Sequence, residues 1–213
     1  LDALAAALAA RTPEAIVAYH VPTKERFEHA RAHGGKVHGI QAWVALPSEA
    51  EETEPSFAHH AAAELPTYEE GGLWARLIAG EAFGAKARVN TFSPMFYVHW
   101  RLALGTRAQL PAEYPERAAY VAEGAVEIGG RVHSAGELLV FAPGRPVLFT
   151  AATPATVMLL GGAAVGERFI EWNFVSSSRD RIEQAKADWR AGRLKLPDLD
   201  NQEFIPLPHS PGS

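Results

Sequence analysis

The stretch that decides the fold runs Gly166-Glu-Arg-Phe-Ile-Glu-Trp-Asn-Phe-Val-Ser-Ser-Ser-Arg-Asp-Arg-Ile-Glu-Gln-Ala-Lys-Ala-Asp-Trp189. Its first part, residues 166–175, places three aromatic residues among β-favouring neighbours and is typical of a strand. A run of three serines follows, and Ser177 lies three residues before Asp180, as in a capping box. The sequence therefore predicts a strand that leads into a helix.

The expected helix covers residues 178–191. Ile182 and Trp189 fall on one face of it, so that face is apolar. Gly192 is placed to end the helix in a left-handed conformation. We therefore expect a closing helix that packs on a sheet through Ile182 and Trp189.

A barrel of short strands is expected before this helix. Runs of β-favouring residues are separated by Gly and Pro at 74–79, 96–104, 118–128, 138–142, 147–150 and 156–160. Gly129-Gly130 is a favourable tight turn of a hairpin. Several short strands with regular turn signals indicate an all-β fold, and a closed antiparallel barrel or sandwich of the jelly-roll kind fits them.

Composition limits the classes of function. The 213 residues carry a formal net charge of −5 and no cysteine. The negative charge argues against direct binding to nucleic acid, and the missing cysteines exclude disulfides and thiolate metal sites. We expect no membrane partner, because no apolar run approaches the roughly 20 residues that span a bilayer. A cytoplasmic location is the default expectation.

Four further motifs accompany the closing stretch. They are His38-Gly-Ile-Gln-Ala-Trp-Val-Ala-Leu-Pro47, Glu54-Pro-Ser-Phe57, Ile78-Ala-Gly-Glu-Ala-Phe-Gly84 and Glu203-Phe-Ile-Pro-Leu-Pro208. In this order the chain resembles the pirin family, whose members have two cupin β-barrels in tandem. The resemblance implies a cupin jelly-roll barrel (double-stranded β-helix) with short helices at the N- and C-terminal ends.

The same resemblance suggests four segments. Residues 1–46 would be the closing part of an N-terminal cupin, with a short helix at 1–11 and a strand at 38–46. Residues 47–72 form an acidic connector and residues 73–165 the C-terminal cupin barrel. Residues 166–213 supply the final strand, the capping helix and a tail. The chain begins with Leu1 and not with methionine, which we interpret as a processed or incomplete polypeptide.

A cupin metal site needs histidines that this sequence lacks. Imidazole and carboxylate ligands suit iron, nickel, copper and manganese, and a His-x-His pair on a strand directs both rings into the barrel. No His-x-His occurs in the chain. The resemblance places Pro111, Glu113 and Val147 near the ligand positions of the second barrel, which is therefore expected to be structural. His99 and His133 are interpreted as ordinary strand histidines.

In the family the metal lies in the first barrel, held by a His-x-His pair and a His-Ser-Glu segment. Alignment of that segment places Glu25 on the glutamate ligand and Thr23 on the histidine. His20 is close enough in sequence to be a substitute ligand. Glu25 and His20 are thus the predicted metal ligands, and iron or another divalent transition metal is the implied cofactor. With so few ligands, we expect this chain not to bind it.

Other histidines offer weaker alternatives. On a helix, Glu25, His29 and His33 would recur every four residues, but the first and last are roughly 12 Å apart along the axis. They therefore cannot share one ion. We interpret these residues, and the pair His59-His60, as solvated polar surface.

The family resemblance implies a metal-dependent quercetin 2,3-dioxygenase, in which the metal orients the flavonol and dioxygen for ring cleavage. We expect this activity to be impaired here. The alternative is a non-enzymatic cupin module that binds a protein partner and regulates it. A flavonoid-like small molecule is the expected ligand in the first case, and a homodimer is possible in either, because residues 1–46 supply too few strands to close a barrel.

Overall fold

The computed structural model describes residues 16–19, 34, 39–54, 56, 58–194 and 205–208. The chain divides into two compact units, which are described separately. One unit is the continuous segment Glu52–Ala164, and the other combines Leu1–Glu51 with Val165–Ser213. The expected helix at 1–11 lies outside the described residues. No helix in the described ranges is long and apolar enough to cross a membrane.

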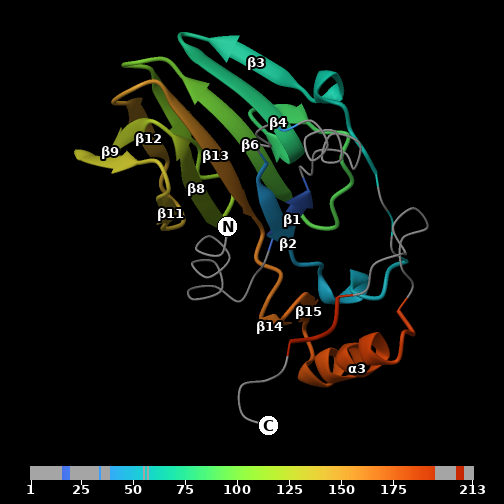
Figure 1. The fold of residues 1–213 in the computed structure, drawn as a ribbon. Coiled ribbons are helices and arrows are strands. Elements are labelled where there is room, and N and C mark those ends of the chain that lie inside the picture. The colour runs from blue at the N-terminus through green and yellow to red at the C-terminus, as the bar shows by residue number, and fades with distance from the viewer. Residues whose placement is uncertain are drawn as a thin grey trace. The chain divides into compact units, whose positions relative to one another are not determined.

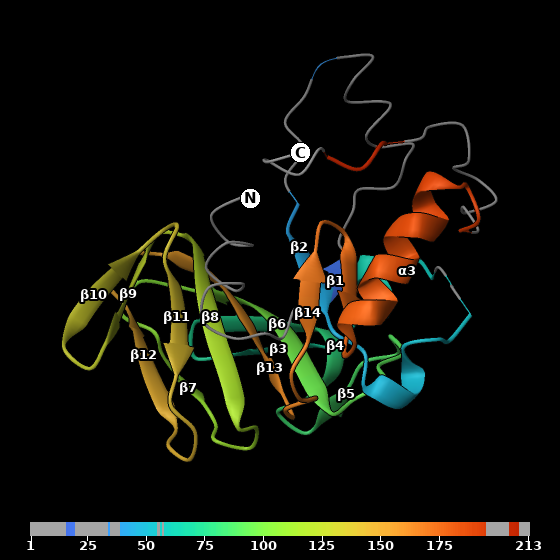
Figure 2. The same cartoon turned by 90° about the horizontal axis from the view of Figure 1, so that it is seen from below.

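Antiparallel strands in two sheets make up the unit Glu52–Ala164 (Figures 1 and 2). The larger sheet has the order β11-β8-β13-β6-β4-β3, with β5 paired to β4. Its strands are β3 (Thr67–Glu70), β4 (Leu73–Ala82), β5 (Ala85–Lys86), β6 (Met95–Leu102), β8 (Glu116–Glu123), β11 (Leu138–Phe141) and β13 (Ala155–Gly162). The smaller sheet, β10-β9-β12-β7, consists of β7 (Arg107–Leu110), β9 (Ala125–Ile128), β10 (Arg131–Ser134) and β12 (Val147–Ala151). The predicted all-β class is confirmed.

Every predicted run in this unit corresponds to a strand, with one interruption. The run 118–128 is divided between β8 and β9 at Gly124, whose φ is +71°. A Cβ there would lie 2.0 Å from the carbonyl oxygen of Pro154, so only glycine fits. The predicted turn at Gly129-Gly130 is confirmed, because both residues have positive φ and Ile128 pairs with Arg131 across it.

Four short strands of this unit were not predicted: β3, β7 and β10, with four residues each, and β5, with two. β3 and β10 are mostly exposed, and their polar sequences carry little of the apolar alternation that identifies a strand. β7 alternates between exposed and buried residues, but four residues are too few for the pattern to stand out. β3 lies in the segment interpreted as an acidic connector, which also contains two 3-10 turns, η1 (Ser48–Ala50) and η2 (Ala62–Glu64).

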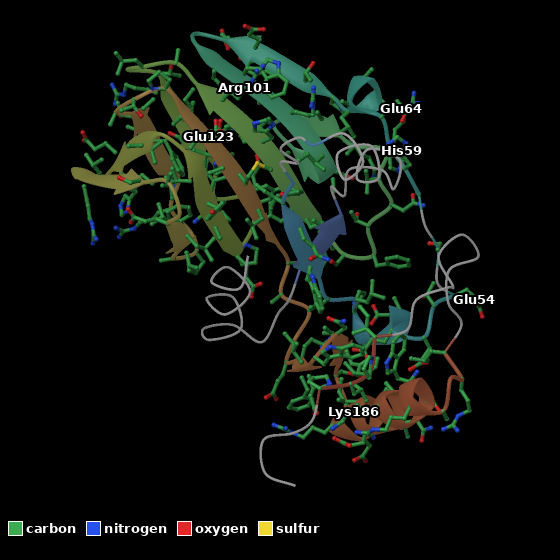
Figure 3. The ribbon with its side chains drawn as sticks, viewed as in Figure 1. Glu54, His59, Glu64, Arg101, Glu123 and Lys186 are labelled. Atoms are coloured by element: carbon green, nitrogen blue, oxygen red, sulfur yellow. The ribbon has the colours of Figure 1, made fainter. Side chains whose placement is uncertain are left out.

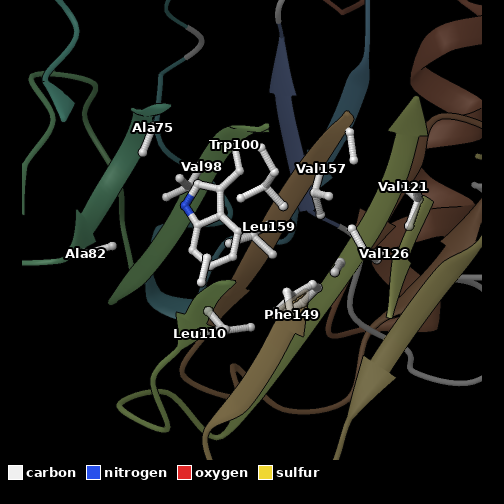
Figure 4. Packing of buried hydrophobic residues seen from close by; sticks show 14 of the residues in the cluster. Ala75, Ala82, Val98, Trp100, Leu110, Val121, Val126, Phe149, Val157 and Leu159 are labelled. Atoms are coloured by element: carbon white, nitrogen blue, oxygen red, sulfur yellow. The ribbon is translucent and has the colours of Figure 1, made fainter. Parts of the chain in front are cut away.

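A packed core fills the space between the two sheets. The larger sheet contributes Val98, Trp100 and Leu159, and the smaller sheet contributes Val126 and Phe149, all at most 1% exposed. Figure 4 shows the Trp100 indole among these side chains. At about 25 cal/mol per Å² of apolar surface removed from water, such side chains supply most of the stability of a domain of this size.

The unit that combines the two ends of the chain has two strand pairs and one helix. β1 (Ile16–Tyr19) pairs with β2 (Gln41–Val44), which falls within the predicted strand 38–46. The segment 166–175 is a hairpin and not the expected single strand. β14 (Phe169–Glu171) and β15 (Phe174–Ser176) are joined through Trp172, whose φ of +53° reverses the chain.

The helix α3 (Arg179–Arg190) confirms the predicted closing helix. Its N-cap is Ser178, whose Oγ accepts a hydrogen bond from the backbone N–H of Arg181, so the predicted capping role of Ser177 is wrong by one residue. Ile182 is buried, and Trp189 is half-buried with its ring 5.4 Å from that of Trp172. Gly192 follows the helix with a φ of +65°, as predicted.

A buried ion pair connects the two segments of this unit. Arg168, 5% exposed, places its Nε 3.0 Å from Oε1 of Glu51 and donates from Nη2 to the carbonyl oxygen of Leu46 at 2.9 Å. Glu51 also accepts hydrogen bonds from the hydroxyl of Ser176 at 2.8 Å and from the backbone N–H of Ser177 at 2.8 Å. Residues more than 115 positions apart in sequence are thus held together by one carboxylate.

Tyr97 is the one buried tyrosine with a large pKa shift among the described residues. It lies on the face of β6 opposite Trp100, is 1% exposed, and its hydroxyl has no hydrogen-bond partner in the described part of the chain. Burial raises the pKa of Tyr97 to about 12 from the usual 10. The folded state therefore binds this proton more tightly than the unfolded state does.

The shift predicts an alkaline loss of stability. The contribution of Tyr97 to the free energy of unfolding is constant well below pH 10. It falls as pH rises from 10 through 12, and the loss at pH 11 is about 1.4 kcal/mol. Tyr97→Phe should be at least as stable as the parent at pH 8, because no hydrogen bond is removed. Between pH 8 and pH 11 its free energy of unfolding should fall by about 1.4 kcal/mol less than that of the parent. Urea titrations of both proteins at the two pH values measure the difference. Equal losses of stability in the two proteins would contradict the raised pKa of Tyr97.

Candidate functional site

The interior of the barrel is where a cupin would hold its metal. Here the interior is occupied by rings in edge-to-face contact, with the Trp100 and Phe149 centroids 5.5 Å apart and the Phe141 and Phe149 centroids 5.9 Å apart. Phe83 reaches the same cluster from the β4–β5 turn, with its centroid 5.8 Å from that of Trp100. These side chains offer no oxygen ligand and no imidazole to an ion.

The residues at the predicted ligand positions do not converge on a point. Val147 begins β12, opposite Leu110, and packs against the core. Pro111 and Glu113 follow β7 and lie at a shallow hollow that is open to solvent and has an internal volume of about 10 Å³. Its other lining residues are Ala82, Phe83, Phe96, Leu110 and Tyr114. Glu113 is the single carboxylate in this lining.

Tyr114 forms the aromatic wall of the hollow. Its ring lies 5.3 Å from that of Phe96, and its hydroxyl donates a hydrogen bond to the backbone carbonyl of Glu81 at 3.0 Å. Burial and the nearby carboxylates of Glu81 and Glu113 raise the pKa of Tyr114. Its phenol therefore stays protonated at neutral pH and acts as a hydrogen-bond donor.

Arg117 is a feature that sequence reasoning missed. It is 2% exposed, and its guanidinium donates to the carbonyl oxygen of Pro111 at 2.8 Å and to that of Ala142 at 2.7 Å. These carbonyls directly follow β7 and β11. The only signal in the sequence is an arginine next to the apolar residues of β8. Arg117 thus cross-links the end of β7 in the smaller sheet to the end of β11 in the larger sheet.

The two strand histidines of this unit, His99 and His133, lie in different sheets. His133 on β10 places Nδ1 2.9 Å from Oε2 of Glu137. The backbone N–H of Ser134 and the His133 ring hold the pKa of Glu137 below its usual range. His99 on β6 sets its ring edge against Trp74, 5.2 Å between centroids. Both side chains thus contact neighbouring residues of their own sheets, in line with the interpretation of them as strand histidines.

The described residues do not fit a transition metal. Among them, no three His, Asp or Glu side chains are grouped closely enough to hold an ion. His20, Thr23 and Glu25, at the predicted site of the first barrel, lie outside the described ranges, as do His29 and His33. The ligand prediction for Glu25 and His20 therefore stays a prediction.

The two-sheet antiparallel barrel agrees with one family. Residues 97–195 match the pirin C-terminal cupin domain. The chain belongs to the pirin family. A pirin-like protein of Caulobacter vibrioides is 68% identical over 185 residues, which are 86% of this chain and 64% of that protein.

Two further relatives are named for an activity. A putative quercetin 2,3-dioxygenase of Pseudomonas aeruginosa is 34% identical over 78% of this chain and 53% of its own length. The crystal structure of quercetin 2,3-dioxygenase from Acinetobacter baumannii superposes with a TM-score of 0.67 at 26% identity. That superposition covers 72% of this chain and 55% of the other.

These comparisons confirm the predicted pirin family and the cupin jelly-roll fold. The chain spans about half to two thirds of the length of the pirin relatives described above. Its Glu52–Ala164 barrel overlaps the matched C-terminal domain over residues 97–164. Trp100, Arg117 and Phe149 therefore lie in the part of the chain that matches the pirin C-terminal cupin domain.

Proposed function

We propose that this chain is the non-catalytic part of a pirin-type protein. In this proposal the barrel within Glu52–Ala164 stabilises the protein and presents surfaces, and the quercetin 2,3-dioxygenase reaction for which relatives are named does not take place inside it. The observation that carries the proposal is the packed interior, where Trp100 and Phe149 are at most 1% exposed. A flavonol is larger than the hollow beside Glu113 can enclose.

The proposal extends to the chain of residues 1–213 as a whole. We expect it to bind no stoichiometric iron, copper or nickel, and to cleave quercetin at no useful rate. One carboxylate at position 25, with Thr23 at a histidine position, leaves an ion mostly hydrated. Neither orientation of a flavonol nor activation of dioxygen follows from so weak a site.

Elemental analysis of the chain, combined with a flavonol turnover assay, tests this. The expected result is far less than one metal ion per chain after any affinity tag has been removed, and no quercetin cleavage above a protein-free control. About one metal per chain, lost in Glu25→Ala and His20→Ala but kept in the control His59→Ala, would overturn the proposal. That result would make His20 and Glu25 true ligands.

A further inference from the structure

Two arginines enclose a tryptophan on the outer face of the larger sheet. Trp74 on β4 is directly opposite Arg101 on β6, and Arg76 follows two residues after Trp74 on the same face. The guanidinium carbons of Arg101 and Arg76 lie 4.1 and 4.8 Å from the centroid of the Trp74 ring. We call Trp74, Arg76 and Arg101 the Trp74 clamp.

The two positive charges of the clamp have no counter-ion in the described part of the chain. No carboxylate there is within ion-pair distance of either guanidinium, and the only contacts recorded for both are with the indole ring. Arg101 is exposed, whereas the Nε of Arg76 is buried and has no acceptor. A buried N–H without a partner is rare in native proteins and indicates a ligand or water that completes it.

The indole also holds the guanidinium groups in place. A cation–π contact fixes the plane of each fork and leaves the N–H groups at its edge free of hydrogen bonds to the ring. Guanidinium forks pair with carboxylates in a bidentate way, and such charge-assisted bonds are about twice as strong as neutral ones. The clamp therefore has the chemistry of a carboxylate receptor.

Acidic residues border the clamp on both sides. Glu69 is opposite Trp74 on β3. On the other side, Thr156 is opposite Arg101, and its hydroxyl donates to Glu123 at 3.2 Å. A register shift next to Thr156 brings Glu123 to this face, and Figure 3 shows Arg101 and Glu123 at the same end of the sheet.

These neighbouring carboxylates restrict which anions can bind at the Trp74 clamp. A continuous polyanion such as nucleic acid would be repelled by Glu69, Glu123 and the net charge of −5. A single acidic side chain brings one negative charge to the two guanidinium groups and is repelled less than a polyanion is. Arg101 is exposed and Trp74 is half-buried, so a ligand gains affinity by spreading over the exposed part of the indole, as a peptide segment does.

We propose that the Trp74 clamp is the docking site for an Asp or Glu side chain in a peptide segment of a partner protein. The site lies wholly in the unit Glu52–Ala164 and is independent of any metal. It therefore goes beyond the proposed non-catalytic role, and either proposal can fail without the other.

The probe is an end-capped peptide, Gly-Ser-Glu-Glu-Ser-Gly, compared with the same peptide carrying Gln in place of both Glu. Proton–nitrogen spectra of the arginine Nε–H groups report binding at individual sites. The Nε–H signals of Arg76 and Arg101 should move on titration with the Glu peptide, with a dissociation constant on the order of 1 mM or tighter. Neither signal should move with the Gln peptide.

Variants identify the groups that bind. Arg101→Gln should weaken binding about tenfold, because one charged hydrogen-bond partner is lost. Arg101→Lys should also weaken it, since the charge is kept and the fork is lost. The control is Arg107→Gln, an exposed arginine on β7 in the other sheet, which should leave the affinity within about twofold. Arg101 is exposed, so its variants should keep the melting temperature of the parent.

Several outcomes would overturn the proposal. Equal shifts with the Gln peptide, or equal weakening by Arg107→Gln, would show that the carboxylates do not bind at the clamp. Inorganic phosphate moving the two signals while the Glu peptide does not would make the clamp a small-anion site. Stronger binding of a single-stranded oligonucleotide than of the peptide would make it a nucleic-acid site.

Discussion

Glu51→Ala is expected to lower the free energy of unfolding of the unit that combines the chain ends by about 3–5 kcal/mol. The substitution leaves the guanidinium of Arg168, which is buried, without its carboxylate. It also removes the acceptor for the hydroxyl of Ser176 and the backbone N–H of Ser177. Urea titration, combined with hydrogen exchange of the amides in α3, measures the loss where it arises.

A neighbouring glutamate provides the control for this result. Glu49 lies in the 3-10 turn η1, which ends immediately before Glu51; it is exposed, and its carboxylate accepts a hydrogen bond from the hydroxyl of Ser48. Glu49→Ala should change the stability by less than about 0.5 kcal/mol. If Glu51→Ala were also below about 1 kcal/mol, the ion pair with Arg168 would not hold the two segments together.

Trp100→Ala should destabilise the unit Glu52–Ala164 by about 3–5 kcal/mol. The indole is 1% exposed and contacts the rings of Phe83 and Phe149, so its removal leaves a cavity that the two sheets cannot close. Thermal unfolding followed by circular dichroism near 220 nm measures the effect. Added indole should raise the melting temperature of the variant, because an apolar cavity of this kind binds a ring of matching shape.

The matched control is Phe92→Ala, since Phe92 is 52% exposed. It should lose less than about 1 kcal/mol and should not respond to indole. A small loss in Trp100→Ala would mean that the barrel interior is loosely filled. A ligand could then enter it, and the proposal of a purely structural barrel would fall.

Local patterns were enough to predict most of this fold. Glycine pairs and apolar runs located the strands around Gly129-Gly130, and a serine before an apolar stripe located α3. Prediction failed where the determining contact was not local. Ser177 has good capping chemistry, but its hydroxyl is bound to Glu51, so Ser178 caps the helix. The reversal at Trp172 was missed because a tryptophan at positive φ is unusual.

In the candidate sites too, local sequence features could be predicted and contacts between distant residues could not. The lack of a His-x-His pair could be read directly from the sequence, and it is the reason that Pro111 and Glu113 were not predicted to be ligands. The cross-link made by Arg117 and the stacking of Arg76 and Arg101 on Trp74 depend on strand register. Register is set by the pairing of distant strands, and one sequence alone does not specify it.

The ion pair between Glu51 and Arg168 has a consequence for synthesis of the protein. The segment Glu52–Ala164 is continuous, so it can fold as soon as it has left the ribosome. Residues 39–51 emerge earlier, yet the carboxylate of Glu51 has no partner until Arg168 and Ser176 have been made. Residues 39–51 are thus completed long after they have been made, and during that delay the open edges of the strand pair β1–β2 remain accessible to chaperones, proteases and aggregation.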